Sequence, residues 1–369
     1  MPGKEKPLLL VSPLDWGLGH TTRIIPLIRY LLYHGCDIVV ACNSTQSRLL
    51  GIEFPGLRFV ELEGYNIRYS RNMTSTRLRL LLQAPNILTK IKQEELWFLR
   101  FLAKNRVDAV ISDNRYGLRA VGIPSILLTH QLALRTGFGR LADAMATRTV
   151  RRFINRFTEC WIPDVKEEKG FAGLLSHPGR LPAIPTRYIG CLSRFVPCAP
   201  PSAAVGQDNI LVVLSGPEPQ RTALEEKIVA ELRAGLHSKV TLVRGLPGAD
   251  RPLPAIDGAT IIDHAGAEQL NRLMCDASLV ISRAGYTSVM DALALKKRML
   301  LIPTPGQGEQ EYLGKHLSET GIAPVLQQQQ FSLAGALRLS ASFAYAFPDI
   351  ALQDYETALN ELIASLPSS

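Results

Sequence analysis

The stretch that decides the fold is ISRAGYTSVMD, at residues 281–291. Its apolar start, its glycine at Gly285 and the residues that follow predict a buried strand, a tight turn and the start of a helix. Backbone N–H groups at such a helix start, together with the helix dipole, can hold a diphosphate. Thr287 and Ser288 add hydroxyl donors, and Asp291, one turn further on, can accept hydrogen bonds from the two hydroxyls of a ribose. The stretch therefore predicts a nucleotide site.

A polar loop follows the next apolar run, which we expect to be a strand at 299–302. Its sequence is PTPGQGEQE, at residues 303–311, and it leads into a helix. Gln310 and Glu311 carry amide and carboxylate groups that can bind sugar hydroxyls. Each of these residues alone is equally well explained as a solvated side chain. Their occurrence behind consecutive strands favours a ligand.

This region belongs to the second of two similar alternations of strands and helices. The second alternation opens with the apolar run at 210–214 and the first with the run at 8–11, and each run leads into a loop containing glycine and proline. Short continuous apolar runs are typical of strands that are buried on both faces of a parallel sheet. The sequence therefore predicts an α/β protein with two Rossmann-like, doubly wound domains.

Prolines mark the connection between these domains. They crowd between residues 160 and 205, where they interrupt any long element. We expect an N-terminal domain at 1–190 and a C-terminal domain at 206–345. The tail from 332 to 366 reads as helix, and we expect its last part, 346–369, to pack back toward the N-terminal domain.

A glycine-containing loop also follows the first strand of the N-terminal half. Gly17 and Gly19 let the backbone approach a ligand, and His20 lies over the crevice where open α/β sheets bind ligands. A histidine can accept a proton at neutral pH, so His20 is a candidate general base. Asp15, in the same loop, and Asp113, at the end of another predicted strand, are candidates to orient its imidazole. The alternative is that His20 only caps the helix or binds a loop carbonyl.

Together these motifs resemble the MurG-like glycosyltransferases of family 28, which have the GT-B fold. The family's Arg-x-Gly-x-x-Ser/Thr-x-x-acid donor pattern begins at Arg283 and ends at Asp291, where the family usually has Glu. Its paired glutamines for the donor sugar fall on Gln310 and Glu311. The resemblance implies two domains that face an interdomain cleft, with the acceptor on the N-terminal domain and the nucleotide sugar on the C-terminal one. The implied donor-binding residues are Gly216, His264, Arg283, Gly285, Thr287, Ser288, Asp291, Gln310 and Glu311; the acceptor-side residues are Gly17, Gly19, His130 and Gln131; and the catalytic residues are His20 and Asp113.

The implied activity is that of an inverting glycosyltransferase. It would move a hexose or N-acetylhexosamine from a nucleotide-sugar donor, UDP-linked in this family, to a lipid-linked or cell-envelope glycan acceptor. The sequence has no set of residues with metal-ligand spacing, so we expect no metal site and no cofactor. Helix N-termini and hydroxyls would then stabilise the leaving nucleoside diphosphate.

Other functions remain open from the sequence. Nucleotide-sugar hydrolases of the same fold share a Gly-x-Gly-His-x-x-Arg pattern that ends here at Arg23, and in them the histidine would activate water. A non-hydrolysing sugar-nucleotide epimerase is less favoured, because its usual acidic residues are not evident. A basic nucleic-acid-binding protein would use the positive N-terminal half. No recognition motif or aromatic platform accompanies that charge, so we expect no nucleic-acid partner.

Charge is divided unevenly along the chain. Residues 1–200 hold 28 Lys and Arg against 15 Asp and Glu, giving +13, whereas residues 201–369 hold 13 against 18, giving −5. A basic half suits an anionic partner such as a membrane face. Basic and apolar residues are interleaved at helical spacing over 135–157 and 77–101. These segments predict either helices that lie on an anionic membrane or core helices with solvated basic faces.

Composition bears on the cellular compartment. No apolar run reaches the ~18–20 residues that a membrane-spanning helix requires, and the N-terminus shows no signal-peptide pattern. These features predict a cytoplasmic protein, and the basic segments at 135–157 and 77–101 add the alternative that it is peripheral on the inner face of the cell membrane. We expect reduced thiols at the six scattered cysteines, which are Cys36, Cys42, Cys160, Cys191, Cys198 and Cys275.

Overall fold

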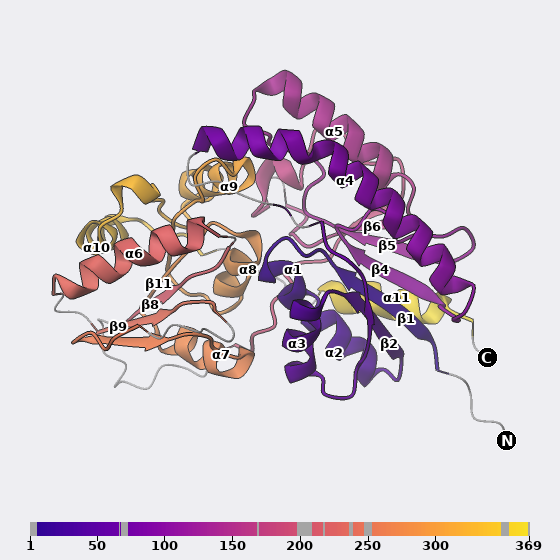
Figure 1. Ribbon diagram of the computed structural model, residues 1–369, viewed down its shortest axis with the longest axis horizontal. Helices are drawn as coiled ribbons and strands as arrows, with labels where there is room; N and C mark the ends of the chain where they lie inside the picture. Colours follow the sequence, from indigo (N-terminus) through magenta and orange to yellow (C-terminus); the bar gives the residue numbers. More distant parts are fainter. Residues whose placement is uncertain are drawn as a thin grey trace. The chain divides into compact units, whose positions relative to one another are not determined.

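The chain forms two compact units in the computed structural model (Figure 1). Unit 1 comprises residues 1–67, 80–193 and 350–369, and unit 2 comprises residues 68–79 and 194–349. Each unit contains one parallel sheet with helices on both faces, which confirms the predicted α/β class with two Rossmann-like domains. The structure describes residues 6–65, 67, 73–167, 170–197, 209–216, 218–235, 239–246, 253–347 and 354–367, and the side chains of all of these except 73–81.

Unit 1 contains a seven-stranded sheet in the order β3-β2-β1-β4-β5-β6-β7, with every neighbouring pair parallel. β1 lies between β2 and β4, so the strand order reverses there. Leu9 to Pro13 of β1 are all buried, which explains why this strand reads as an unbroken apolar run. The strands are β1 (Leu8–Pro13), β2 (Asp37–Cys42), β3 (Arg58–Glu61), β4 (Ala109–Asp113), β5 (Ser125–Leu128), β6 (Glu159–Ile162) and β7 (Thr186–Tyr188).

Helices cover both faces of this sheet (Figure 1). α4 and α5 pack on one face, where Phe98 of α4 contacts the core of β1 and β4 and Ile154 of α5 contacts that of β5 and β6. α11 packs against α2, and Tyr30 donates a hydrogen bond to Asn360 at 3.0 Å. The helices of unit 1 are α1 (Leu18–Arg23), α2 (Ile25–Tyr33), α3 (Ser44–Glu53), α4 (Met73–Leu102, of which residues 73–79 belong to unit 2), α5 (Arg140–Ile154), the 3-10 turn η1 (Gly173–Leu175) and α11 (Asp354–Ser365).

Unit 2 contains a five-stranded parallel sheet in the order β10-β9-β8-β11-β12, which reverses between β8 and β11. α6 and α10 bury their apolar faces on one side of it, and α7 lies on the other (Figure 1). The strands are β8 (Asn209–Val213), β9 (Lys239–Val243), β10 (Ala259–Ile262), β11 (Leu279–Ser282) and β12 (Met299–Leu301). The helices are α6 (Gln220–Arg233), α7 (Ala267–Asp276), α8 (Tyr286–Ala294), α9 (Gly308–Glu319), the 3-10 turn η2 (Gln328–Gln330) and α10 (Leu333–Ser342).

Three sequence expectations about elements need correction. α1 begins at Leu18, so Gly19 and His20 lie inside a short helix rather than in a loop. The proline-rich segment is not only a connection, because β6 and β7 add two strands to the first sheet within it or at its start. The tail is not one helix, since α10 ends at Ser342 and α11 starts at Asp354.

The cysteines also differ from expectation. Cys275 is disulfide-bonded, so the expectation of reduced thiols throughout is wrong at this position. Cys36, Cys42, Cys160 and Cys191 are free and buried as expected, and Cys198 lies outside the described residues. Burial raises the pKa of the Cys42 thiol to about 12 and holds it in the neutral form.

None of the described helices combines the length and the apolar character needed to cross a membrane.

Candidate functional site

The reversal of strand order in unit 1 places two loops next to each other. β1 and β4 are parallel neighbours, and Pro13 at the end of β1 pairs in register with Asp113 at the end of β4. Chain segments that leave the carboxyl ends of two such strands enclose the usual ligand crevice of an open α/β sheet. α1 follows β1 within a few residues, so it carries His20 to the same edge as Asp113.

His20 and Asp113 form a hydrogen-bonded pair. The Nδ1 atom of His20 lies 3.1 Å from Oδ2 and 3.2 Å from Oδ1 of Asp113, whose side chain is fully buried. Burial opposes ionisation of this carboxyl, but the Arg23 guanidinium and the His20 imidazole outweigh it and lower the pKa of Asp113 to about 2. An ionised carboxylate can only accept, so Nδ1 of His20 carries the hydrogen. In the neutral ring the lone pair is then on Nε2, as a general base requires.

Arg23 ties this pair to a second histidine. Its Nε donates to Oδ2 of Asp113 at 2.8 Å, its Nη2 donates to Oδ1, and its Nη1 lies 3.2 Å from Nδ1 of His130. Because a guanidinium can only donate, Nδ1 of His130 accepts and its Nε2 carries the hydrogen. Arg23 is 1% exposed and His130 is 2% exposed. Arg23 is a functional residue that was not predicted, although its place in the Gly-x-Gly-His-x-x-Arg pattern was a usable signal.

The loop between β1 and α1 is held by side chains from other elements. Gly17 has a φ of +84°, in the left-handed region that favours glycine, whereas Gly19 is helical. Asp15 accepts a hydrogen bond from the Tyr65 backbone N–H at 2.8 Å, so Asp113 and not Asp15 is the carboxylate on His20. Gln46 belongs to the capping box at the start of α3. Its Nε2 donates to the carbonyl of Leu14 and to the hydroxyl of Thr21, each at 3.0 Å.

Gln131, the other predicted acceptor-side residue, directly follows His130 at the end of β5. Its backbone N–H donates to the Thr129 hydroxyl at 3.0 Å. The next two residues, Leu132 and Ala133, donate backbone hydrogen bonds to the carbonyl of Leu175. The segment after β5 is therefore fixed at both ends.

In unit 2, the predicted donor residues lie on segments that leave the carboxyl ends of parallel strands. Gly216 follows β8, His264 follows β10, Gly285 follows β11, and the loop before α9 follows β12. The sheet thus brings these segments to one edge. Gly216 has a φ of +100°, and nothing lies within 4 Å of where a Cβ would be. Burial and, less strongly, the neighbouring Arg194 lower the pKa of His264.

α8 begins as the sequence predicted. Gly285 is its N-cap, in an extended conformation, and Thr287 and Ser288 in its first turn are partly exposed. Asp291, one turn further, is 7% exposed. The helix start thus presents hydroxyl groups to solvent, with a carboxylate set behind them.

Arg283 is almost fully buried, at 1% exposed. Its Nη2 donates to the carbonyl of Gln220 at 2.6 Å, and its Nη1 donates to the carbonyls of Ile302 and Pro303 at 3.4 and 3.5 Å. Burial lowers its pKa to about 10. The guanidinium therefore links the start of α6 to the loop after β12, which is a structural connection that the sequence pattern did not reveal.

Gln310 and Glu311 brace the loop that precedes their own helix. Oε1 of Gln310 accepts from the Thr304 N–H at 2.9 Å, and Oε1 of Glu311 accepts from the Gly306 N–H at 2.8 Å. Gly306 has a φ of +83°, as the sharp turn requires. Both predicted sugar-binding residues are therefore held in place by their own loop.

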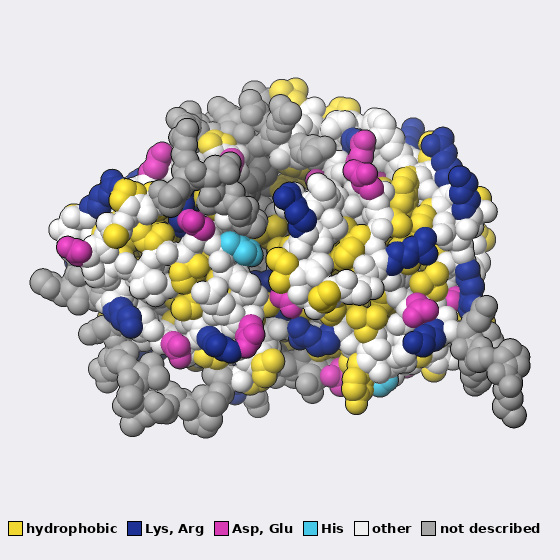
Figure 2. Space-filling model, turned by 60° about the horizontal axis from the view of Figure 1, so that its bottom comes forward, with side chains coloured by type: hydrophobic (Ala, Val, Ile, Leu, Met, Phe, Trp, Pro, Cys, Tyr) yellow, Lys and Arg dark blue, Asp and Glu magenta, His cyan; other side chains and the backbone are white. Residues whose placement is uncertain are grey.

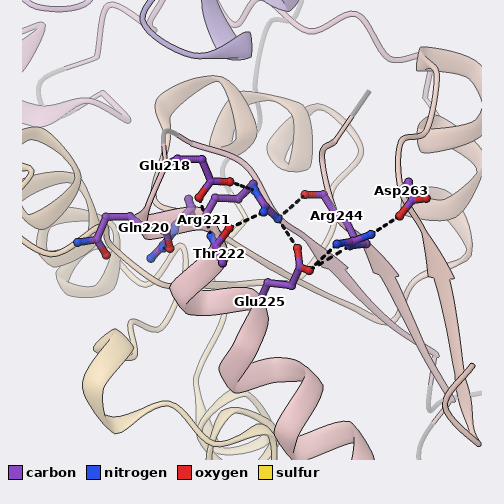
Figure 3. A network of polar contacts seen from close by, with 8 residues as sticks. Glu218, Gln220, Arg221, Thr222, Glu225, Arg244 and Asp263 are labelled. Carbon is purple, nitrogen blue, oxygen red and sulfur yellow. Dashed lines mark hydrogen bonds and ion pairs between the residues drawn. The ribbon is translucent and has the colours of Figure 1, made fainter. Parts of the chain in front are cut away.

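A network of arginines and carboxylates, not expected from the sequence, anchors α6 to β9 and β10 (Figure 3). Arg244 donates to Glu225 at 2.8 Å and to Asp263 at 2.5 Å, and Arg221 donates to Glu225 and, at 2.6 Å, to Glu218. Figure 3 shows both arginines pointing toward Glu225. The network fixes Asp263, the residue before His264, and the loop after β8. Arg221 binds carboxylates three and four residues away, whereas the two partners of Arg244 are each 19 residues away and leave no pattern in the sequence.

Among the described residues, no three His, Cys, Asp or Glu side chains gather as metal ligands would.

Comparison with known proteins gives a family match in unit 2. Residues 259–344 match the sequence model of the glycosyltransferase family 28 C-terminal domain. A curated relative, the UDP-N-acetylglucosamine–N-acetylmuramyl-(pentapeptide) pyrophosphoryl-undecaprenol N-acetylglucosamine transferase 1 of Bacillus thuringiensis (strain Al Hakam), is 40% identical over 80 residues. That alignment covers 21% of this chain and 22% of the relative. The enzyme of the same type from Clostridium novyi (strain NT) is 29% identical over 111 residues, which cover 29% of this chain and 31% of the relative.

Solved structures are similar over nearly the whole chain. The spinosyn rhamnosyltransferase SpnG has a TM-score of 0.63 at 18% identity, covering 97% of this chain and 96% of its own. MurG of Acinetobacter baumannii has a TM-score of 0.52 at 18% identity, covering 98% and 96%. At these identities the likeness shows the fold. Residues 259–344 are thus similar to the glycosyltransferase family 28 C-terminal domain, and the chain as a whole has the GT-B fold.

Proposed function

We propose that this protein is a metal-independent, inverting glycosyltransferase that moves a hexose or N-acetylhexosamine from a UDP-linked donor to a lipid-linked or cell-envelope glycan. The observation that carries the proposal is the His20–Asp113 pair at the strand reversal of unit 1, in a chain whose other unit matches the family 28 C-terminal domain over residues 259–344. The curated relatives are named as transferases of N-acetylglucosamine from UDP-N-acetylglucosamine, which supports this donor class.

The donor would bind at the carboxyl edge of the sheet in unit 2. The start of α8, with Thr287 and Ser288, would hold the diphosphate, and Asp291 would accept from the ribose. Gln310 and Glu311 would contact the sugar through the groups that do not brace their loop. A neighbouring structure, SpnG complexed with thymidine diphosphate, supports a nucleoside diphosphate ligand for this fold. Gly216 and His264 would flank the nucleotide, and Arg283 would hold the loops around it.

The proposed chemistry is a single displacement. Nε2 of His20 takes the proton of the acceptor hydroxyl while that oxygen forms a bond to the anomeric carbon, and the bond from that carbon to the diphosphate breaks. The configuration inverts because the new bond forms opposite the old one. Asp113 keeps Nδ1 of His20 protonated and stabilises the imidazolium that forms. The dipole of α8 and its hydroxyls offset the charge of the leaving diphosphate.

The acceptor would be handled by unit 1. Gly17, Gly19, His130 and Gln131 are the acceptor-side residues in this proposal. His130 is buried and lies against Arg23, so its role in this proposal is to hold the segment before Gln131 in place rather than to contact the acceptor itself. A glycan or lipid-linked hydroxyl must reach Nε2 of His20, whose side chain is 14% exposed.

An exposed face of α5 that carries both apolar and basic side chains supports a lipid-linked acceptor. Leu141 is 84% exposed and Met145 is 72% exposed, and Phe138 precedes them. Arg148 and Arg152, exposed and one and two turns further on, continue the same face. Figure 2 brings the opposite side of unit 1 forward, and there Lys and Arg side chains lie scattered among hydrophobic and acidic ones. We propose that α5 docks on an anionic leaflet, which would place the protein on the inner face of the cell membrane. The side chains of the 77–101 candidate are not described before Leu82.

The test is UDP release from UDP-N-acetylglucosamine with and without a polyprenyl-pyrophosphate-linked N-acetylmuramyl acceptor. Release that depends on the acceptor, with the sugar recovered on it at the inverted configuration, supports the proposal. Free sugar formed at full rate without acceptor would instead make the protein a hydrolase in which His20 activates water. Turnover that persists unchanged in excess EDTA supports metal independence.

A further inference from the structure

A second buried charged pair lies next to the His20–Asp113 pair in unit 1. Glu94 of α4 is 3% exposed, and Arg115, two residues after Asp113, is fully buried. Nη1 of Arg115 lies 3.4 Å from Oε1 of Glu94. Oε2 of Glu94 accepts from the Tyr65 hydroxyl at 2.9 Å and from the Gly117 N–H at 3.2 Å. One carboxylate thus gathers three groups from two different segments.

The first of these segments is the turn that directly follows Asp113. Asn114 has a φ of +55°, a conformation that non-glycine residues seldom adopt. The Ser112 hydroxyl donates to the Arg115 carbonyl at 2.5 Å, which closes the turn. A Cβ on Gly117 would come within 2.5 Å of Cβ of Glu94, so the turn sits directly against α4. Glu94 is therefore the carboxylate that clamps the turn carrying Asp113.

The second segment leads back to the loop before His20. Tyr65, whose hydroxyl binds Glu94, donates its backbone N–H to Asp15 at 2.8 Å. Asp15 lies in the loop between β1 and α1. Glu94 is thus connected to both sides of the His20–Asp113 hydrogen bond, through Arg115 and Gly117 on one side and through Tyr65 and Asp15 on the other.

We propose that Glu94 is a positioning residue. It keeps His20 and Asp113 within hydrogen-bonding distance of each other by holding both chain segments that carry them. This inference rests on the function proposed for that pair. Stability alone does not explain the cluster well. Oε1 of Glu94 and both Nε and Nη1 of Arg115 have no hydrogen bond from any described residue, and a buried ion pair with such geometry is a poor source of stability.

The electrostatics of the cluster agree with this reading. Burial raises the pKa of Glu94 to about 7, against the lowering effects of Arg115, the Tyr65 hydroxyl and the Gly117 N–H, and Asp15 raises it further. Carboxyls with a raised pKa occur both at functional sites and in buried ion-pair networks, so the contacts described above, and not the pKa, carry the positioning role.

The test reads the tautomer of His20 from the ¹⁵N chemical shifts of its ring in the full-length protein, without any ligand. In the native protein we expect the Nδ1–H form that donates to Asp113. In Glu94→Gln we expect the Nε2–H form to become clearly populated, and kcat to fall about tenfold with the donor KM within about twofold. Tyr65→Phe removes the hydrogen bond that connects the same carboxylate to the segment of Tyr65, without changing any charge, so it should shift the tautomer in the same direction.

The matched control is Glu95→Gln, which removes the neighbouring carboxylate of α4, paired with Arg119 and Arg156 at the surface. A shifted tautomer in both test variants and not in the control supports the inference. The inference is overturned if the tautomer is unshifted in both test variants or shifts equally in the control. It is also overturned if only Glu94→Gln shifts the tautomer, because that shift would be a field effect of the lost charge. Should Glu94→Gln not fold, Tyr65→Phe decides. Full turnover in His20→Ala would defeat the proposed function, and the tautomer would still report on Glu94.

Discussion

At the scale of residues, the central feature is a cluster of four polar side chains at the strand reversal of unit 1. Asp113 accepts from His20 and from two nitrogens of Arg23, and Arg23 also contacts His130. The arrangement sets the protonation of both histidines, because each hydrogen bond allows only one direction of donation. Because Asp113 is held ionised beside Arg23 and accepts from Nδ1 of His20, the basic nitrogen of His20 is Nε2, which points away from Asp113.

The pH dependence of stability tests the ionisation of Asp113. Its pKa is lowered from 3.8 to about 2 in the folded protein, so its contribution is complete above the unfolded value and is lost as pH falls through the folded one. We expect the difference in unfolding free energy between the native protein and Asp113→Asn to shrink by about 2 kcal/mol between pH 5 and pH 2. Urea titrations at fixed pH measure this difference. A difference that is constant over this range would show that Asp113 is not held ionised by its neighbours.

Some of this residue-level picture could be predicted from the sequence. His20 and Asp113 were predictable because each lies just beyond an apolar strand, and parallel strands end at one edge of the sheet. The contacts of Arg23 and Glu94 could not be predicted, because each joins residues far apart in the sequence. Arg23 meets Asp113 90 residues away, and Glu94 of α4 meets the backbone of Gly117 23 residues away. Arg283 shows the limit of motif reasoning, because its place in the pattern is visible and its burial is not.

At the scale of elements, α8 and α5 carry the two binding surfaces that we propose. α8 starts at a glycine behind a fully buried strand, which is why the apolar run and the turn residue together predicted it. The start of α1 could not be predicted in the same way. Gly17 and Gly19 look alike in the sequence, and only the first has the left-handed conformation of a helix boundary. The same uncertainty merged α10 and α11 into one expected helix.

The role of α8 is tested by Asp291→Ala. Loss of the ribose contact should weaken binding of UDP about tenfold or more and leave the rate at saturating donor within about threefold, because the lost contact is made equally before and during reaction. Isothermal titration calorimetry with UDP measures the affinity. Glu268→Ala on the exposed face of α7 is the control and should bind UDP as the native protein does. An unchanged affinity in Asp291→Ala would remove this residue from the donor site.

The role of α5 is tested with vesicles. Replacing Arg148 and Arg152 by Gln should lower the affinity for phosphatidylglycerol vesicles roughly 30-fold, as measured by co-sedimentation. Each basic residue near an anionic surface contributes about 1 kcal/mol to this affinity. Leu141→Ser should weaken binding further, whereas Ile52→Ser should not, although Ile52 on α3 is also an exposed apolar side chain (71%, against 84% for Leu141). Equal binding by all variants would place the membrane contact elsewhere.

At the scale of the whole molecule, the chain joins two Rossmann-like units that carry different chemistry. Unit 1 contains the His20–Asp113 pair, and unit 2 contains the region that matches the family 28 C-terminal domain. The fold was predictable because both sheets are parallel and buried on two faces, which leaves continuous apolar runs. The disulfide at Cys275 was not, because cysteine spacing alone does not fix pairing.

Ligand-induced stabilisation tests the donor class for the intact chain. A ligand that binds only the folded state at about 100 times its Kd adds about 2.7 kcal/mol of stability. We expect UDP and UDP-N-acetylglucosamine to raise the melting temperature more than thymidine or guanosine diphosphate at the same concentration. Equal shifts for all nucleotides would contradict a UDP-specific donor site.

The most direct test of His20 as the base of a glycosyl transfer is the initial rate of acceptor-dependent UDP release at saturating UDP-N-acetylglucosamine. We expect His20→Ala to lower this rate about 100-fold or more, because general base catalysis contributes roughly that factor, while its affinity for UDP stays within about twofold. His34→Ala, which removes an exposed histidine of unit 1, should keep the native rate. A native rate in His20→Ala would contradict the proposed mechanism.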